Sequence, residues 1–293
     1  MDIAFCINHL GLIGLGVTIT SLIRNCSAIE KLHIHFLCAY LSERDKFEIK
    51  QLLTFLKFPG NFSFIDFDPA TTFSSFKPLH GDWTPYGRLL LSDILKVPKV
   101  LYLDSDLVID VDVLELDTFD FGGKAIAAVH GGFVRTEYEH DFYVNRLGLS
   151  PALASFNSGV LLLNLTLWRE QHIRERCFEL ANRFPSELVT ADQTILNGIF
   201  AGSFAKLPDK YNSTWSAHNE QQEVAGRVIH HFVGSPKPWD LFGFLIHKGY
   251  RIWKSYSNER WEMHFFKFSL SNLKRTWYLR RSYVRILKNN MKR

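Results

Sequence analysis

The sequence predicts an α/β protein in which helices flank a mainly parallel sheet. Short apolar runs typical of buried strands recur along the chain, and segments with helical spacing of apolar residues separate them. Such alternation is typical of βαβ units, which build parallel sheets. Of the 293 residues, 46% are hydrophobic and 25 are phenylalanine, so the chain can bury a large core and is neither disordered nor fibrous.

The expected strands are short apolar runs, and the first begins almost at the amino end of the chain. The second starts with period-2 alternation, whereas the last three are the most apolar, as in strands buried on both faces. In chain order the expected strands are residues 2–7, 32–38, 62–67, 99–103, 126–129 and 159–164.

Helical segments are expected between these strands. Residues 17–25 carry apolar side chains at helical spacing, and residues 42–56 open with Ser42 and an acid-rich first turn, which is typical of a helix N-terminus. Residues 89–95 and 191–200 are the other two predicted helices, and we expect Thr190 to cap the last one. The order of strands and helices predicts a nucleotide-binding type of α/β architecture, Rossmann-like in its layers.

The sequence gives no indication of secretion or of a membrane span. The amino end lacks the basic and long apolar segments of a signal peptide, and no stretch of about 18 apolar residues occurs. The cysteines show no metal-ligand spacing, and we expect reduced, mostly buried thiols. The protein is therefore expected in the cytoplasm. The four cysteines are Cys6, Cys26, Cys38 and Cys177.

The basic residues gather at the carboxyl end. Residues 271–293 contain eight basic residues and no acid, so with a total of +4 the rest of the chain carries −4. We expect one main domain, residues 1–260, and a basic, aromatic, amphipathic helical appendage, residues 261–293. This appendage suits an anionic membrane surface; the alternative is a solvated tail or a helix docked on the body. No nucleic-acid partner is expected. The apolar positions of the appendage are Leu273, Trp277, Val284, Leu287 and Met291.

Two carboxylates follow the apolar strand 99–103 directly, in Asp104-Ser105-Asp106. In open parallel sheets, ligands bind outside the carboxyl ends of the strands. Two carboxylates at such an end are costly to bury unpaired, and a hard divalent cation with oxygen ligands resolves that cost. The alternative is a solvated acidic turn.

A second polar segment extends from His230 to Trp239. It combines imidazoles, Gly234, which lets the backbone approach a ligand, and Lys237, which supplies a positive charge for phosphate. The alternative, which is favoured for this segment taken alone, is a proline-rich turn with a packed tryptophan.

Together these motifs resemble glycosyltransferase family 8, a family of retaining enzymes that includes glycogenins and bacterial lipopolysaccharide α-galactosyl- and α-glucosyltransferases. The resemblance covers about residues 1–255 and rests on five motifs in the family's order. They are Tyr86-Gly87-Arg88-Leu89; Val100 to Asp106; Phe156-Asn157-Ser158-Gly159 through Leu165, followed by Trp168; Ala191-Asp192-Gln193-Thr194-Ile195-Leu196-Asn197; and His231-x-x-Gly234-x-x-Lys237-Pro238-Trp239.

This resemblance implies a GT-A fold, a UDP-sugar donor and a Mn²⁺ ion, or Mg²⁺. It implies that Asp104, Asp106 and His231 are the metal ligands. Gly234 and Lys237 match residues that hold the diphosphate. The other positions that we assign to donor binding are Cys6, Asn8, Arg88, Ser105, Asn157, Ser158 and Asp192, together with the metal ligand Asp104.

Catalysis is assigned to Gln193 and Asp192. The resemblance places Gln193 beside the anomeric carbon, and an amide is a poor nucleophile, so we expect same-face substitution; the competing hypothesis makes Asp192 the nucleophile. Family members usually carry an acid after the first strand to contact uracil, and this chain has Asn8 there. An amide can still hydrogen-bond to a base edge.

The resemblance predicts transfer of a hexose, galactose or glucose, to a saccharide acceptor such as the lipopolysaccharide or lipooligosaccharide core. The acceptor is then an oligosaccharide or a lipid-linked saccharide, reached at the inner face of the cytoplasmic membrane. The alternatives are a weak or inactive sugar-nucleotide or glycan-binding member of the fold and a glycogenin-like self-glycosylating primer.

Overall fold

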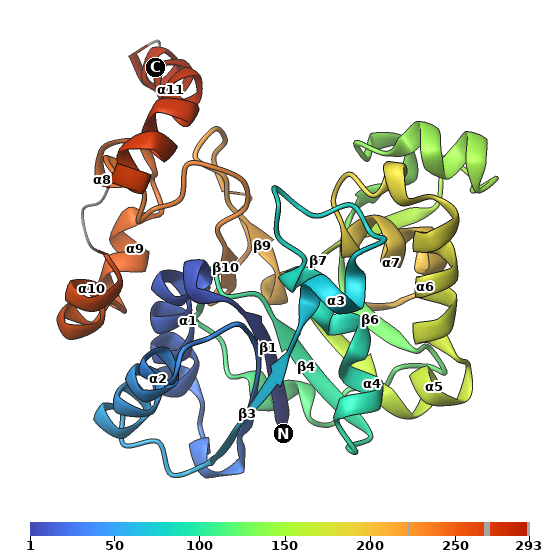
Figure 1. Cartoon of the computed structure of the whole chain (residues 1–293), viewed down its shortest axis with the longest axis horizontal. Helices are drawn as coiled ribbons and strands as arrows, with labels where there is room; N and C mark the ends of the chain where they lie inside the picture. Colours follow the sequence, from blue (N-terminus) through green and yellow to red (C-terminus); the bar gives the residue numbers. More distant parts are fainter. Residues whose placement is uncertain (222, 267–269, 292–293) are drawn as a thin grey trace.

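The computed structural model describes residues 1–221, 223–266 and 270–291. Its centre is a seven-stranded sheet with the order β3-β2-β1-β4-β7-β6-β8 (Figure 1). β7 is antiparallel to both of its neighbours, and the other pairs are parallel. The mainly parallel α/β prediction is therefore confirmed. The strands are β1 (Asp2–Ile7), β2 (His33–Ala39), β3 (Asn61–Phe67), β4 (Lys99–Leu103), β6 (Ile126–Phe133), β7 (Ala154–Asn164) and β8 (Ala205–Leu207).

Helices cover both faces of this sheet, because successive side chains of each strand point to opposite faces. In β1, Ile3 and Phe5 pack with the apolar sides of α1 and α2, whereas Ala4 belongs to a second core with α4 to α7. These helices are α1 (Leu12–Asn25), α2 (Glu43–Phe55), α3 (Pro69–Phe73), α4 (Leu91–Ile94), α5 (Leu165–Glu170), α6 (Ile173–Arg183) and α7 (Asp192–Phe200).

A small second sheet begins directly after Asp104-Ser105-Asp106, the acidic turn. It has the order β5-β10-β9, with β5 (Leu107–Ile109) antiparallel to β10 (Ile229–His231) and β9 (Ser213–Thr214) parallel to β10. Residues 104–106 thus connect the large sheet to the small one. Since β10 pairs with β5, its last residue, His231, is brought next to that connection.

The predicted helices differ from the structure in two details. The expected helix 89–95 is helical as far as Ile94, but Leu89 and Leu90 end a 3₁₀ helix, Thr84–Leu90, with Pro85 in its first turn, and only the short α4 that follows is α-helical. Thr190 does not cap α7: Ala191 holds the N-cap position without a side-chain cap, and its φ of 54° is left-handed. The hydroxyl of Thr190 instead donates to Glu139 at 2.6 Å.

The carboxyl-terminal helices form a separate projection beside α1 (Figure 1). Trp261 is buried, and its indole N–H donates to the carbonyl of Leu12 at 2.9 Å. α11 packs on α8 through Tyr283 and Ile286, which bury against Ile246. Lys292 and Arg293 of the basic tail lie outside the described residues, as does the side chain of Met291. The helices are α8 (Gly243–Ile246), α9 (Tyr250–Ser255), α10 (Glu259–Phe265) and α11 (Leu270–Met291).

The expected apolar stripe of α11 faces outward over most of its length. Leu273, Trp277, Val284 and Leu287 are between 42% and 66% exposed, because Tyr283 and Ile286 make the contact with the body. Among the described residues, none of the helices is both long enough and apolar enough to cross a membrane.

Candidate active site

The acidic turn is held in place by α1. Thr18 is fully buried; its hydroxyl oxygen lies 3.0 Å from the carbonyl of Ser105 and 2.9 Å from that of Leu107, and it accepts from the Leu107 N–H at 3.1 Å. Gly14 makes this approach possible, since a Cβ there would lie 2.4 Å from the Ser105 carbonyl oxygen. At the other end of the turn, the Asp104 N–H donates to the carbonyl of Gly159 at 2.8 Å.

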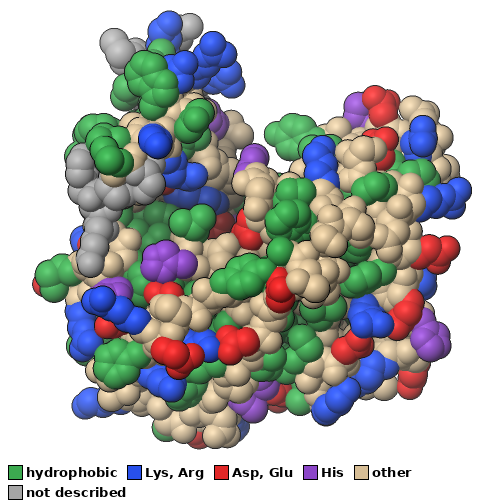
Figure 2. All heavy atoms as spheres, viewed as in Figure 1, with side chains coloured by type: hydrophobic (Ala, Val, Ile, Leu, Met, Phe, Trp, Pro, Cys, Tyr) green, Lys and Arg blue, Asp and Glu red, His purple; other side chains and the backbone are tan. Residues whose placement is uncertain are grey.

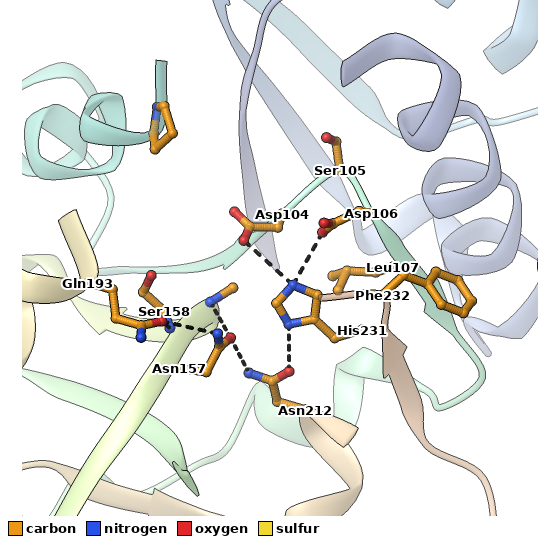
Figure 3. A network of polar contacts seen from close by, with 12 residues as sticks. Asp104, Ser105, Asp106, Leu107, Asn157, Ser158, Gln193, Asn212, His231 and Phe232 are labelled. Carbon is orange, nitrogen blue, oxygen red and sulfur yellow. Dashed lines mark hydrogen bonds and ion pairs between the residues drawn. The ribbon is translucent and has the colours of Figure 1, made fainter. Parts of the chain in front are cut away.

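Asp104, Asp106 and His231 converge at this turn (Figure 3). Their ligand atoms all lie within 4.8 Å of one another. His231 Nε2 is 3.3 Å from Asp106 Oδ1 and 3.8 Å from Asp104 Oδ2. Gly159 leaves room for this arrangement, because a Cβ there would lie 2.2 Å from His231 Cε1.

A chain of amides fixes which nitrogen of His231 carries the proton. The backbone N–H groups of Ser158 and Gly159 can only donate, and they meet the side-chain oxygens of Gln193 and Asn157 at 3.1 and 2.9 Å. Asn157 Nδ2 therefore donates to Gln193 Oε1 at 3.0 Å.

The same chain continues to the imidazole (Figure 3). Asn212 Nδ2 donates to Asn157 Oδ1 at 3.1 Å, which turns Asn212 Oδ1 toward His231 Nδ1 at 3.0 Å. An oxygen acceptor at Nδ1 requires the proton there, so the lone pair of Nε2 faces the two carboxylates. A buried acceptor that orients an imidazole in this way is typical of metal-binding histidines.

The donor set fits a divalent cation. Asp106 Oδ1 is buried and accepts no hydrogen bond, although His231 Nε2 lies within 3.3 Å. Burial raises the pKa of Asp106, but the nearby charge of Lys237 and its hydrogen bond to this carboxylate oppose burial, and the pKa is held well below its usual range. An ionised, buried oxygen without a donor, beside a second carboxylate and an imidazole lone pair, is a suitable site for Mn²⁺ or Mg²⁺.

Lys237 brings a positive charge to the same place. Its ammonium donates to Asp106 Oδ2 at 2.6 Å and also to the carbonyl of Phe232. It follows Gly234, whose φ of 68° is left-handed and suits glycine.

Arg88 links the acidic turn to the start of α7. It is buried; Nη2 lies 2.9 Å from Asp104 Oδ1, Nε lies 3.1 Å from Asp192 Oδ2, and Nη1 donates to the carbonyl of Ser158. Burial raises the pKa of Asp192 to about 6, and Arg88 opposes that rise. Asp192 is thus a carboxyl group that changes charge near neutral pH.

A second carboxylate lies at the end of β1. Asn8 Nδ2 donates to Asp82 Oδ2 at 2.8 Å, and Asn8 Oδ1 accepts from the Gly11 N–H at 3.1 Å. Asp82 Oδ1 is held by the N–H and hydroxyl of Thr84 at 2.8 and 2.6 Å. A carboxylate contributed by a residue 74 positions later thus lies next to Asn8.

Most of the predicted site residues share one network, and three do not. Asp104, Asp106, Asn157, Ser158, Asp192, Gln193, His231, Lys237 and Arg88 are connected by the contacts above. Ser105 takes part through its backbone carbonyl. Asn8 and Gly234 lie outside the network, and Cys6 is a half-buried thiol beside Gly87, with a pKa raised by burial.

Three residues of the site, Thr18, Asp82 and Asn212, carry no signal in the sequence. Thr18 and Asp82 make contacts 87 and 74 positions away, Asn212 contacts His231 and Asn157 at separations of 19 and 55, and none of the three stands in a motif of the predicted family. His230 turns away from the acidic turn and pairs with Gln221, which leaves His231 as the imidazole of the site.

Comparisons with known proteins identify the family and the fold. The sequence profile of glycosyl transferase family 8 matches residues 2–242. The chain is 29% identical over 186 residues to "Probable glycosyl transferase Gly" of Streptococcus gordonii, covering 61% of this chain but only 25% of that protein's length. It is 28% identical over 255 residues to lipopolysaccharide glucosyltransferase WaaO of Escherichia coli K12, covering 82% of this chain and 72% of the relative.

The fold is also similar to that of a solved structure, galactosyltransferase LgtC in complex with donor and acceptor sugar analogues. The TM-score is 0.74 at 26% identity, over 89% of this chain and 99% of LgtC. The layers and sheet described above are thus those of the GT-A fold. With most of its length matched by the family profile, the chain belongs to glycosyl transferase family 8.

Proposed function

We propose that this protein is a metal-dependent, retaining hexosyltransferase that moves galactose or glucose from a UDP-sugar to a saccharide acceptor. The observation that carries the proposal is the convergence of Asp104, Asp106 and His231 with the ammonium of Lys237, which lies 2.6 Å from Asp106. A carboxylate–imidazole set beside a lysine is suited to a cation and a diphosphate together.

Asp104, Asp106 and His231 would hold the cation, Mn²⁺ or Mg²⁺. The bound ion would act as a Lewis acid that stabilises the negative charge on the departing nucleoside diphosphate. Lys237 would add a fixed positive charge at the same phosphates. Because these groups are already held by Asn212, Thr18 and backbone amides, little reorganisation accompanies the reaction.

The donor sugar would lie between the acidic turn and the N-terminus of α7. Arg88 and Asn157 would bind its hydroxyls, with Asp192 and Gln193 at the anomeric carbon. We favour same-face substitution: the bond to the diphosphate breaks as the acceptor oxygen bonds to the sugar, and the acceptor's proton passes to the departing phosphate oxygen. Gln193 is an amide and a poor nucleophile, and the carboxylate of Asp192 is already engaged by Arg88 Nε at 3.1 Å. Isolation of a covalent sugar–Asp192 adduct would rule out same-face substitution.

The base would lie against β1. We assign uracil recognition to Asp82 together with Asn8. The side-chain amide of Asn8 donates to Asp82 and accepts from the Gly11 N–H, and so orients the Asp82 carboxylate. A carboxylate oxygen is a suitable acceptor for the N–H of uracil. Cys6, Ser105 and Gly234 would line the donor through contacts made only when it is bound.

The acceptor would enter from the open side of the site. Figure 2 shows the molecule hollowed between the carboxyl-terminal helices and the lobe that residues 134–150 form near α6 and α7, and Figure 1 places this hollow above the carboxyl ends of the parallel strands. We propose the lipopolysaccharide or lipooligosaccharide core as the acceptor, because WaaO carries that assignment by name.

A lipid-linked acceptor would bring the protein to the inner face of the cytoplasmic membrane. α11 supports this proposal: Trp277 and Tyr278 are 66% and 79% exposed, among exposed arginines. Aromatic and basic side chains on one exposed surface favour anionic lipid. Replacing both aromatic residues by alanine should reduce co-sedimentation with phosphatidylglycerol vesicles, and unchanged sedimentation would refute the membrane assignment.

A donor panel tests the proposed function. Purified protein is incubated with Mn²⁺ and, separately, UDP-galactose, UDP-glucose, UDP-N-acetylglucosamine and UDP-N-acetylgalactosamine, and released UDP is measured. We expect release from one of the two hexoses, greatly reduced in Asp106→Asn and by EDTA. No release from any donor, with intact UDP binding, would instead indicate a sugar-nucleotide-binding protein.

A further inference from the structure

The loop that carries Lys237 is held at both ends by a single side chain of α11. Arg275 Nη2 donates to Ser235 Oγ at 3.2 Å, on one side of Lys237, and to Asp240 Oδ2 at 2.9 Å, on the other side. Arg275 Nε also donates to Asp240 Oδ1 at 2.7 Å. The guanidinium thus closes the segment Ser235–Asp240 into a ring.

Asp240 connects Arg275 to Lys237, the residue whose ammonium faces the acidic turn. Asp240 Oδ2 accepts from the backbone N–H of Lys237 at 2.8 Å, and the Asp240 side chain is only 8% exposed. Lys237 Nζ in turn reaches Asp106 at 2.6 Å. A series of three contacts therefore connects α11 to the candidate metal site.

α11 is positioned for this contact independently of Arg275. The hydroxyl of Tyr283 donates to the carbonyl of Leu241 at 2.6 Å, and Tyr283 and Ile286 bury against Ile246. The segment between the Lys237 loop and α8 is tightly packed, since a Cβ at Gly243 would lie 2.1 Å from the Pro238 carbonyl oxygen. Two-point attachment of the helix gives the guanidinium a defined place over the loop.

We propose that Arg275 is a positioning residue for the donor diphosphate, through which docking of the C-terminal helix sets the affinity of the Lys237 loop for the nucleotide. This inference rests on the proposed function, which places the diphosphate at Lys237. α11 would thus act on donor binding in addition to the proposed contact with the membrane.

The expected effect is on binding rather than on chemistry. The loop would hold the diphosphate in both the ground state and the transition state, and loss of such uniform binding raises KM with little change in kcat. Because the ion pair is partly exposed, Arg275→Ala should weaken Mn²⁺·UDP binding by about 5- to 10-fold. Arg275→Lys, which keeps the charge but loses the two-pronged geometry, should recover only part of that loss.

The experiment compares wild type, Arg275→Ala, Arg275→Lys and a matched control, Arg281→Ala. Arg281 is exposed on the same helix and contacts no charged or hydrogen-bonding partner within the described part of the chain. Calorimetry gives the Kd for UDP in Mn²⁺, and amide hydrogen exchange reports on residues 233–240. We expect weaker binding and faster exchange in Arg275→Ala, a smaller effect in Arg275→Lys and none in Arg281→Ala, with the melting temperature of Arg275→Ala close to that of Arg281→Ala.

The outcomes separate the two proposals. Wild-type protein that fails to bind UDP would refute the proposed function. Wild-type binding that Arg275→Ala leaves unchanged, or loop exchange that is equal in the Arg275 and Arg281 variants, would refute the positioning role alone. A global rise in exchange in Arg275→Ala without one confined to residues 233–240 would likewise show that Arg275 only stabilises the fold.

Discussion

Replacing Asn212 by alanine tests the amide chain that orients His231. The substitution removes the acceptor of His231 Nδ1 and one of two donors to Asn157 Oδ1. Asn212 is 6% exposed, so water does not readily take its place. An unsatisfied buried donor costs about 1–3 kcal/mol, and loss of such an orienting partner lowers metal affinity about 10- to 100-fold.

The assay is a titration with Mn²⁺ in which free ion is read from its electron paramagnetic resonance signal, with and without UDP. Asn212→Asp separates the two contacts: a carboxylate still accepts from His231 Nδ1 but cannot donate to Asn157 Oδ1, so this variant should retain more of the affinity than Asn212→Ala. Circular dichroism checks that both variants are folded. If Asn212→Ala bound Mn²⁺ with the wild-type Kd, the imidazole would not be oriented for metal by this chain.

Four further predictions follow from the same contacts. The pKa of Asp192 is raised to about 6, so if its ionised form is required, kcat/KM measured from pH 5 to 8 should fall about tenfold per unit below pH 6; Asp192→Asn should lack this limb. Gly159→Ala would place a Cβ 2.2 Å from His231 Cε1, and should lower Mn²⁺ affinity at least about 10-fold in the same titration. Thr18→Val leaves the buried Leu107 N–H without a partner, and urea unfolding should show a loss of about 1–3 kcal/mol. Asp82→Ala should weaken UDP binding about 10-fold by calorimetry while leaving pyrophosphate binding unchanged, and equal losses for both ligands would argue against a contact with the base.

The parts of the fold that could be predicted are those with a local signal. Apolar runs specify six of the seven strands of the large sheet, all except the three-residue β8, and the position of Asp104-Ser105-Asp106 after one of them places the site at the carboxyl edge. The short strands β5, β9 and β10 have no such signal, because two or three residues form a strand only when a partner is supplied by a distant segment.

The parts that could not be predicted depend on contacts across long stretches of chain. Thr18 looks like any residue of an amphipathic helix, although its hydroxyl anchors a turn 87 positions later. Asn212 stands alone between unremarkable neighbours. Helical spacing predicts the apolar stripe of α11, but it does not determine which side of the helix packs on the body of the protein. Tyr283 and Ile286 make that contact instead of Trp277.

The most direct test of the metal–diphosphate site is the affinity for UDP with Mn²⁺ and with EDTA, in wild type and Asp106→Asn. Linkage requires that a cation held jointly by protein and diphosphate strengthens UDP binding, and that UDP strengthens Mn²⁺ binding by the same factor. We predict much tighter UDP binding in Mn²⁺ than in EDTA for wild type, and loss of that difference in Asp106→Asn. Equal affinity in Mn²⁺ and EDTA for the wild type would contradict the account.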